Sequence, residues 1–243
     1  MVARLLLTSP ELPLIAVAEI AVAKALIVAP HPDDETLGCG GAIALLRSIG
    51  CDVRVLVISD GTLSHPNSRK YPRLALQELR ESETISALAI LGVEATAIKF
   101  LRLQDGSVSS QNADISSYLA QITPEIVFLP LRYDPHPDHR ASFQLVSKAL
   151  TSLNMTPRLL EYPIWDWDDS QSTNWDNNKL TSWQLDISSV VELKQQAIAS
   201  YRSQITNLID DDPQGFRLTP EMLANFNRPV EVYLEEYDER IAT

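Results

Sequence analysis

The chain has few cysteines, few basic residues and no long uninterrupted apolar run. Two cysteines among 243 residues, Cys39 and Cys51, are too few to staple a chain of this length, so reduced, partly buried thiols and a cytoplasmic location are expected. Lys and Arg number 20 against 32 Asp and Glu, which gives a formal net charge of -12. Nucleic acids and anionic membranes require clustered basic residues, so neither is an expected partner.

The most apolar stretch, residues 13–29, does not read as a membrane span. Glu19 and Lys24 interrupt it, and it continues directly into a polar histidine-containing motif. A charged segment followed by an apolar segment and a cleavage site is also missing, so no signal peptide is predicted. We therefore expect no integral membrane segment, but an N-terminal arm over residues 1–23 followed by a buried strand.

Short apolar runs alternate with helical patterns along most of the chain. Strands are expected at residues 25–29, 53–59, 97–101, 125–130 and 158–163, with helices at 40–49, 73–91, 113–122 and 141–150. Beyond these, a strand is expected at 183–187, a helix at 190–203 and a last strand at 230–237. Such alternation predicts an α/β fold with a Rossmann-like, mostly parallel sheet and helices on both faces.

The length of 243 residues favours one large domain with appendages over two domains. We expect a single domain over residues 1–243, which includes the arm at 1–23. Residues 164–182 are rich in Trp, Asp, Asn and Ser and read as an acidic, aromatic loop, and residues 204–243 read as a C-terminal appendage.

The expected sheet places two motifs together. If the five strands take the common order 3-2-1-4-5, the first strand (25–29) and the fourth (125–130) are neighbours where the strand order reverses. Ligands bind beyond the carboxyl ends of such strands. The run His31-Pro32-Asp33-Asp34-Glu35 follows the first strand, and His136-Pro137-Asp138-His139 follows the fourth. The two motifs, about a hundred residues apart, are thus predicted to meet in one crevice.

Together the motifs hold three of the four histidines and several carboxylates, which are the ligand types of a hydrolytic metal site. We predict His31, Asp34 and His139 as ligands of Zn²⁺, with room left for water. A mixed nitrogen and oxygen site can also hold iron, cobalt or manganese, so other divalent transition metals stay open.

The remaining motif residues are candidates for the chemistry. Asp33 adjoins the ligand Asp34 and can act as general base, although a turn or helix-capping aspartate is the alternative. His136 can protonate the leaving nitrogen or polarise the oxyanion, with a further metal contact as the alternative. Asp138 is expected to orient that imidazole. Glu35 is expected to partner a ligand histidine.

The motif APHPDDE after a buried strand, followed by GCGG and a helix, with HPDH about a hundred residues later, resembles the PIG-L/LmbE family of zinc-dependent N-deacetylases. The resemblance covers roughly residues 24–205. It extends to three weaker elements, which are Arg80-x-x-Glu83, Leu103-x-Asp105-Gly106 and Tyr201-x-Ser203-Gln204. Members of this family remove acetyl, or occasionally larger acyl, groups from N-acylated amino sugars.

The resemblance implies roles for individual residues. The family's metal ligands correspond to His31, Asp34 and His139, its general base to Asp33 and its second histidine to His136. Two further positions, Arg80 and Asp105, match residues that contact the substrate sugar. The fold implied is LmbE-like.

Other residues are weaker candidates for substrate binding. His65 and Arg69 lie in a polar loop, where a surface position is the alternative for the histidine and an anionic aglycone is the expected ligand of the arginine. Trp165, Trp167 and Trp175 can stack on sugar rings, or can instead pin their loop to the core or to a subunit interface.

These observations predict a hydrolase that removes the N-acetyl group from an N-acetylated amino sugar or its conjugate, by zinc-activated water with Asp33 as general base. Cleavage of a larger acyl or conjugate amide at the same metal is an alternative. A sugar-binding protein without turnover is another, although binding alone needs neither Asp33 nor His136. The small-molecule amino sugar is the expected partner, and a homo-oligomer is compatible with the sequence.

Overall fold

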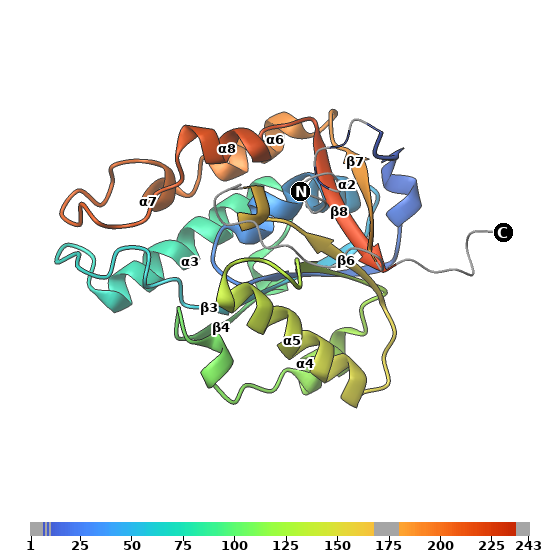
Figure 1. Cartoon of the computed structure of the whole chain (residues 1–243), viewed down its shortest axis with the longest axis horizontal. Helices are drawn as coiled ribbons and strands as arrows, with labels where there is room; N and C mark the ends of the chain where they lie inside the picture. Colours follow the sequence, from blue (N-terminus) through green and yellow to red (C-terminus); the bar gives the residue numbers. More distant parts are fainter. Residues whose placement is uncertain (1–6, 8, 10, 168–179, 237–243) are drawn as a thin grey trace.

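The computed structural model describes residues 7, 9, 11–167 and 180–236, and its strands form one sheet (Figure 1). The strands are β1 (Leu14–Ile15), β2 (Lys24–Ala29), β3 (Asp52–Ser59), β4 (Ile98–Leu103), β5 (Ile126–Pro130), β6 (Arg158–Tyr162), β7 (Leu180–Asp186) and β8 (Val230–Glu236). Their order across the sheet is β1-β7-β8-β6-β5-β2-β3-β4. The pairs are parallel except those of β8, which runs antiparallel to β6 and β7.

The five strands expected in 3-2-1-4-5 order are β2 to β6, and the observed order β4-β3-β2-β5-β6 confirms that arrangement. The order reverses between β2 and β5, which are neighbours in the sheet. Their carboxyl ends therefore lie side by side, and the two histidine motifs begin there. The predicted α/β fold with a mostly parallel sheet is confirmed.

Helices cover both faces of the sheet (Figure 1). They are α2 (Asp34–Ser48), α3 (Arg73–Ile90), α4 (Ser116–Ile122), α5 (Pro137–Ser152), α6 (Val191–Ile198), α7 (Arg202–Ile205) and α8 (Pro220–Phe226), with short 3-10 turns η1 (Val17–Ile20), η2 (Ala95–Ala97), η3 (Val108–Ser110) and η4 (Trp165–Trp167). Helices α2, α3 and α6 pack on one face, while α4 and α5 pack on the other.

The alternation of side chains along β2 explains why the sheet needs two helical layers. Ala25, Ile27 and Ala29 join the apolar cluster under α2, α3 and α6. Leu26 and Val28, which point the opposite way, join the cluster under α4 and α5. Because successive side chains of a strand face opposite sides, a strand apolar at every position is stable only when both sides are covered.

Helix α2 begins at Asp34, six residues before the helix expected at 40–49. Glycines at positions 38, 40 and 41 weaken helix propensity, and this made the early turns look like a loop. Packing requires these glycines, since a Cβ on Gly38 would lie 2.3 Å from Tyr162 Cδ2 and one on Gly41 would lie 2.5 Å from Ile187 Cγ2. Close packing against the neighbouring elements therefore outweighs local propensity.

The segments outside the central repeat also contribute to the sheet. Within residues 204–243, expected as an appendage, β8 lies between β6 and β7 rather than at an edge. Of the described residues in the N-terminal arm, two pair with β7 and form β1 at the sheet edge. The domain boundaries themselves stay predictions, and most of the expected loop at 164–182, Trp175 included, lies outside the described residues.

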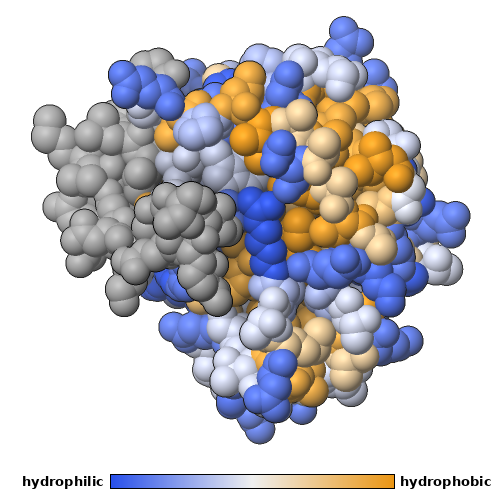
Figure 2. Space-filling view, turned by 90° about the vertical axis from the view of Figure 1, so that its right-hand side faces the viewer, coloured by the Kyte–Doolittle hydropathy of each residue, from blue (hydrophilic) through white to orange (hydrophobic). Residues whose placement is uncertain are grey.

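Figure 2 shows the face of the molecule that lies to the right in Figure 1. Apolar surface gathers over its upper and right-hand parts, and hydrophilic side chains run between the apolar areas. Among the described residues, no helix combines the length and the apolar character that crossing a membrane requires.

Candidate metal centre and active-site cavity

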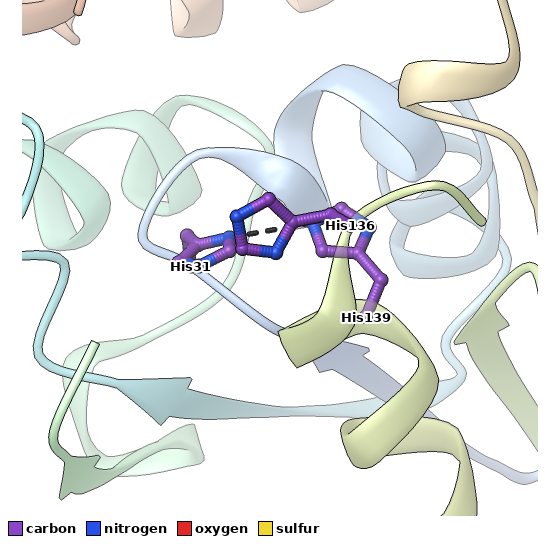
Figure 3. Close-up of side chains that lie close together, drawn as sticks. All are labelled: His31, His136 and His139. Carbon is purple, nitrogen blue, oxygen red and sulfur yellow. Dashed lines mark hydrogen bonds between the residues drawn. The ribbon is translucent and has the colours of Figure 1, made fainter. Parts of the chain in front are cut away.

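The two histidine motifs form the beginnings of two helices. His31 lies in the turn between β2 and α2, and Asp34 is the first residue of α2. His136 caps the N-terminus of α5, and His139 lies in the first turn of that helix. Figure 3 shows the three imidazoles grouped between these helix ends. The helix N-termini point their unpaired N–H groups at this place, which favours negative charge there.

The structure brings the three predicted ligands together. Asp34 Oδ2 lies 3.2 Å from His31 Nδ1 and 3.2 Å from His139 Nε2, and the two nitrogens are 3.3 Å apart. Two ligand atoms bound to a tetrahedral zinc at 2.0–2.1 Å are separated by about 3.3 Å. The donor atoms are thus spaced as one face of such a coordination shell.

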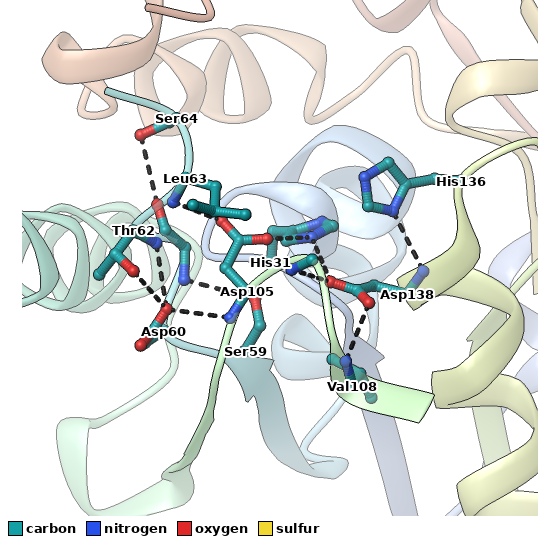
Figure 4. A network of polar contacts seen from close by, with 12 residues as sticks. His31, Ser59, Asp60, Thr62, Leu63, Ser64, Asp105, Val108, His136 and Asp138 are labelled. Carbon is teal, nitrogen blue, oxygen red and sulfur yellow. Dashed lines mark hydrogen bonds and ion pairs between the residues drawn. The ribbon is translucent and has the colours of Figure 1, made fainter. Parts of the chain in front are cut away.

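Carboxylates stand behind both imidazoles. His31 Nε2 lies 3.2 Å from Asp105 Oδ1 and 3.5 Å from Asp138 Oδ2 (Figure 4). His139 Nδ1 lies 3.1 Å from Asp134 Oδ2. A carboxylate on the far nitrogen fixes the tautomer and ring orientation of a metal-binding histidine and makes its ligand nitrogen more basic. This arrangement is the one expected for ligand histidines.

The carboxylates around His31 and His139 also favour a cation at this place. Burial opposes the charged imidazolium of His31, yet Asp105, Asp138 and Asp34 hold its pKa well above the ordinary value. At His139, burial acts in the same downward direction, and Asp134 and Asp34 raise its pKa to about 9. The carboxylates therefore require positive charge between them, which a divalent metal supplies directly. The donor set fits a zinc-type ion.

Asp33 takes an unusual backbone conformation between the ligands His31 and Asp34. It caps α2 with φ 135°, a value that L residues rarely adopt. Its backbone N–H donates to Glu35 Oε2 at 3.2 Å, and Tyr201 and Thr36 donate to Glu35 Oε1. Glu35 was expected to partner a ligand histidine; this expectation is wrong, because its carboxylate turns inward to hold the Asp33 backbone.

The Asp33 carboxylate faces the cavity and has one strong partner. Arg80 Nη2 donates to Asp33 Oδ2 at 3.0 Å, and the same guanidinium donates to the carbonyl oxygens of Pro32 and Gly61. Burial raises the pKa of Asp33 to about 8, and Arg80 acts against this rise. Arg80 therefore fixes the carboxylate and joins the loop that carries it to the loop after β3.

His136 is held in one orientation by its own helix. The backbone N–H of Asp138 donates to His136 Nδ1 at 3.2 Å, so Nδ1 is the acceptor and Nε2 carries the proton in the neutral ring. Burial, together with His31 and His139, lowers the pKa of His136 to about 4. Trp165 stacks on the ring, with centroids 6.1 Å apart.

Asp138 has different partners from those expected. Its carboxylate accepts from the backbone N–H groups of Gly106 and Val108 and lies beside His31. The expectation that this carboxylate orients His136 is therefore corrected, since its backbone N–H does so. The carboxylate points away because it occupies the second position of α5, where it serves the loop after β4.

A cavity of about 520 Å³ opens over the candidate metal centre. Eight of the residues predicted for the site line it, namely His31, Asp33, Asp34, Arg80, Asp105, His136, Trp165 and Trp167. Two predicted substrate contacts lie elsewhere. His65 is buried against Gly215, and Arg69 is exposed, with its backbone N–H bound to Asp211. Neither lines the cavity, because the polar loop that carries them packs against the segment around residues 211–215.

The sequence patterns missed two buried carboxylates that support the site. Asp134 contacts His139 and also accepts from the backbone N–H of His136. Asp60 accepts from the Asp105 backbone N–H and from Thr62. Asp134 lies five residues before a predicted ligand, and this proximity was the one available signal. For Asp60 no local signal points to the site, since its link to Asp105 comes from another loop.

Together, the fold and the site define an α/β domain with a mostly parallel sheet, in which two imidazoles and one carboxylate meet at the helix ends where the strand order reverses. Residues 26–150, about half of the chain, match the family described as PIG-L: GlcNAc-PI de-N-acetylase. The chain belongs to this PIG-L family of deacetylases.

Relatives of this family support the assignment. Diacetylchitobiose deacetylase of Thermococcus kodakarensis is 31% identical over 193 residues, covering 75% of this chain and 70% of the relative. Probable N-acetyl-alpha-D-glucosaminyl L-malate deacetylase 2 of Bacillus cereus is 24% identical over 195 residues, covering 76% of this chain and 86% of the relative. These relatives are, by name, deacetylases of N-acetylated sugar conjugates.

The fold is shared with solved structures of deacetylases. N,N'-diacetylchitobiose deacetylase of Pyrococcus horikoshii, in complex with an inhibitor, superposes with a TM-score of 0.63 at 23% identity. The match covers 87% of this chain and 82% of that structure. At this identity the likeness establishes the fold alone.

Proposed function

We propose that this protein hydrolyses the N-acetyl group of an N-acetylated amino sugar or its conjugate, with a divalent metal, Zn²⁺ by expectation, held by His31, Asp34 and His139. The observation that carries the proposal is the triangle of ligand atoms with sides of 3.2, 3.2 and 3.3 Å at the floor of the cavity. The deacetylase relatives supply the reaction type.

When bound there, zinc supplies a Lewis acid for the amide oxygen and lowers the pKa of a water towards about 7. The chain's own residues then do the rest. Asp33 lines the cavity next to the ligand Asp34, so its carboxylate can take the proton of an attacking water. Arg80 keeps one oxygen of this carboxylate engaged, which leaves Oδ1 for the water.

His136 is suited to stabilise the oxyanion. The Asp138 backbone N–H occupies Nδ1, so the Nε2–H is the donor available toward the cavity. A neutral donor held in place in this way stabilises negative charge that develops on the former carbonyl oxygen. We assign this role to His136, and the proton that Asp33 takes from the water can then pass to the leaving nitrogen, so that the amine departs neutral.

The test separates metal binding from turnover. Asp33→Asn should keep the metal content of the wild-type protein, measured by elemental analysis, and should lose nearly all release of acetate from N-acetylated sugars. His139→Ala should lose both metal and activity. If Asp33→Asn releases acetate at the wild-type rate, Asp33 is not the general base.

A panel of substrates distinguishes N-deacetylation from cleavage of longer acyl groups and from sugar binding without turnover. Acetate release from free, nucleotide-linked and lipid-linked N-acetylglucosamine is compared with release of longer acyl groups from N-acyl analogues. Preference for the longer acyl groups would make the protein an amidase of another kind. Complete inactivity of the metal-loaded protein on every amide would favour a sugar-binding role.

A cytoplasmic location is part of the same proposal. Cys39 and Cys51 are both free and buried in the structure, which supports a compartment where thiols stay reduced.

A further inference from the structure

The cavity over the candidate metal centre has two unlike sets of lining residues. Four of them, Arg80, Asp105, Ser64 and Gln204, are polar. Eight others belong to one apolar cluster and form an apolar wall that reaches the ring of His136 through Trp165; they are Leu37, Ile164, Trp165, Trp167, Phe216, Leu218, Met222 and Phe226. The wall is built from α2, from the turn after β6 and from the segment that contains α8, so elements far apart in the chain converge to make it.

The charges around the cavity are also one-sided. Among the described lining residues, Arg80 is the only Lys or Arg, and it is already bound to Asp33 and to two carbonyl oxygens. Four carboxylates line the same space, and Glu221 of α8 is one of them. An anionic group on the substrate would therefore meet carboxylates, and among the described lining residues it would find no guanidinium or ammonium without a partner.

We propose that the substrate of this site is an amino sugar that carries an uncharged apolar substituent, and that the apolar wall binds this substituent. This inference rests on the proposed function, because the scissile amide must reach the metal centre. The sugar hydroxyls fit the polar side of the cavity, and the wall then receives an alkyl or aryl group. A conjugate with carboxylates, such as the malate named for one relative, is disfavoured at this site.

The size of the cavity agrees with a ligand larger than one sugar. Its volume of about 520 Å³ lies within the range of roughly 300–1,000 Å³ for pockets that hold drug-sized molecules. Each methylene that leaves water for an apolar wall should tighten binding about 3- to 4-fold. Affinity should therefore rise with chain length until the wall is covered.

The substituent can be attached at two places, and the experiment distinguishes them. One series carries methyl, butyl, hexyl and octyl groups on the anomeric oxygen of N-acetylglucosamine. The other carries acetyl, butanoyl and hexanoyl groups on the nitrogen of glucosamine. For each compound, KM and kcat are measured on the metal-loaded protein. A fall in KM of at least tenfold along either series supports the proposal and tells where the apolar group is attached.

Binding without turnover provides a second readout. Calorimetric titration compares octyl glucosaminide with glucosamine, neither of which contains the scissile amide. At least tenfold tighter binding of the octyl compound is expected. If no compound is hydrolysed yet the octyl compound still binds tighter, the proposed function fails and the apolar subsite stands. If hydrolysis occurs but both series and the titration are flat, the present inference alone is overturned.

A charge placed in the wall tests the residues directly. Met222 lines the cavity on α8, and Ala224 is an exposed residue of the same helix that does not line it. Met222→Lys should raise KM at least fivefold for the longest compound of the series in which KM falls, and should lower it for an N-acetylglucosamine glycoside that carries a carboxylate. Ala224→Lys adds the same charge and should change both values less than twofold. Equal behaviour of the two variants would contradict the placement of the subsite.

Discussion

Arg80 Nη2 donates to Asp33 Oδ2 at 3.0 Å, and both residues are almost fully buried. The guanidinium also holds the carbonyl oxygens of Pro32 and Gly61. Gly61 has φ 63°, and a Cβ at this position would lie 2.6 Å from Arg80 Nη1. The Arg80 side chain thus ties α3 to the two loops around the site and sets the position of the proposed base.

Replacement of Arg80 by lysine should reduce kcat by about a hundredfold, because one ammonium cannot reproduce the planar set of donors that holds Asp33. Metal content should stay at the wild-type level, since Arg80 touches no proposed ligand atom. Arg54→Lys, which alters a partly exposed ion pair with Asp52, is the matched control and should keep full activity. An unchanged kcat in Arg80→Lys would show that Asp33 is positioned without it.

Replacement of Asp134 by asparagine should weaken metal binding by about 10- to 100-fold, because His139 loses the carboxylate on its far nitrogen. The dissociation constant can be measured by competition with a coloured chelator. Asp114→Asn removes an exposed carboxylate and serves as the control. Wild-type affinity in Asp134→Asn would mean that this carboxylate does not support the ligand.

Replacement of Tyr201 by phenylalanine should lower both stability and kcat. Its hydroxyl donates to the buried Glu35, which in turn accepts from the Asp33 backbone N–H. Loss of one partner of a buried carboxylate costs about 1–3 kcal/mol of unfolding free energy. Chemical denaturation measures this loss, and steady-state kinetics should show a lower kcat with an unchanged metal content.

The half-buried Tyr118 contacts Lys99 with its ring, so Tyr118→Phe makes the same chemical change away from the site. It should leave kcat unaltered. If Tyr201→Phe destabilises the protein without any change in kcat, the hydrogen bond between Glu35 and the Asp33 backbone does not contribute to catalysis.

The pH dependence of stability should contain a contribution from His65. Burial lowers the pKa of His65 from its ordinary value of 6.5. A lowered pKa means that the folded protein binds fewer protons than the unfolded chain. The contribution of His65 to the free energy of unfolding is therefore fully present above pH 6.5 and is lost as the pH falls through the folded-state pKa. Between pH 8 and pH 5, thermal unfolding of His65→Gln should therefore depend less on pH than that of the wild-type protein. If the unfolding temperatures of His65→Gln and of the wild-type protein change equally with pH, His65 makes no such contribution.

Local patterns were sufficient to predict much of the fold. The apolar runs that became β2, β3 and β5 are short, and they alternate with longer helical patterns, so they were predicted as strands buried on both faces. From these, general rules for parallel sheets led to the strand order, and this order in turn placed both histidine motifs at one edge. The early start of α2 was missed because its glycines are selected by contacts with Tyr162 and Ile187, which no local pattern records.

Within the site, the sequence alone determined which residue types lie at the candidate metal centre: imidazoles and carboxylates directly after two neighbouring strands can only gather at that edge of the sheet. Only the tertiary structure decided the partner of each group. Glu35 holds the Asp33 backbone, Asp138 supports His31, and residues 216–226 complete the apolar wall of the cavity. The physical reason is that side-chain direction and long-range packing depend on contacts between distant segments, whereas strand and helix patterns depend on neighbours in the chain.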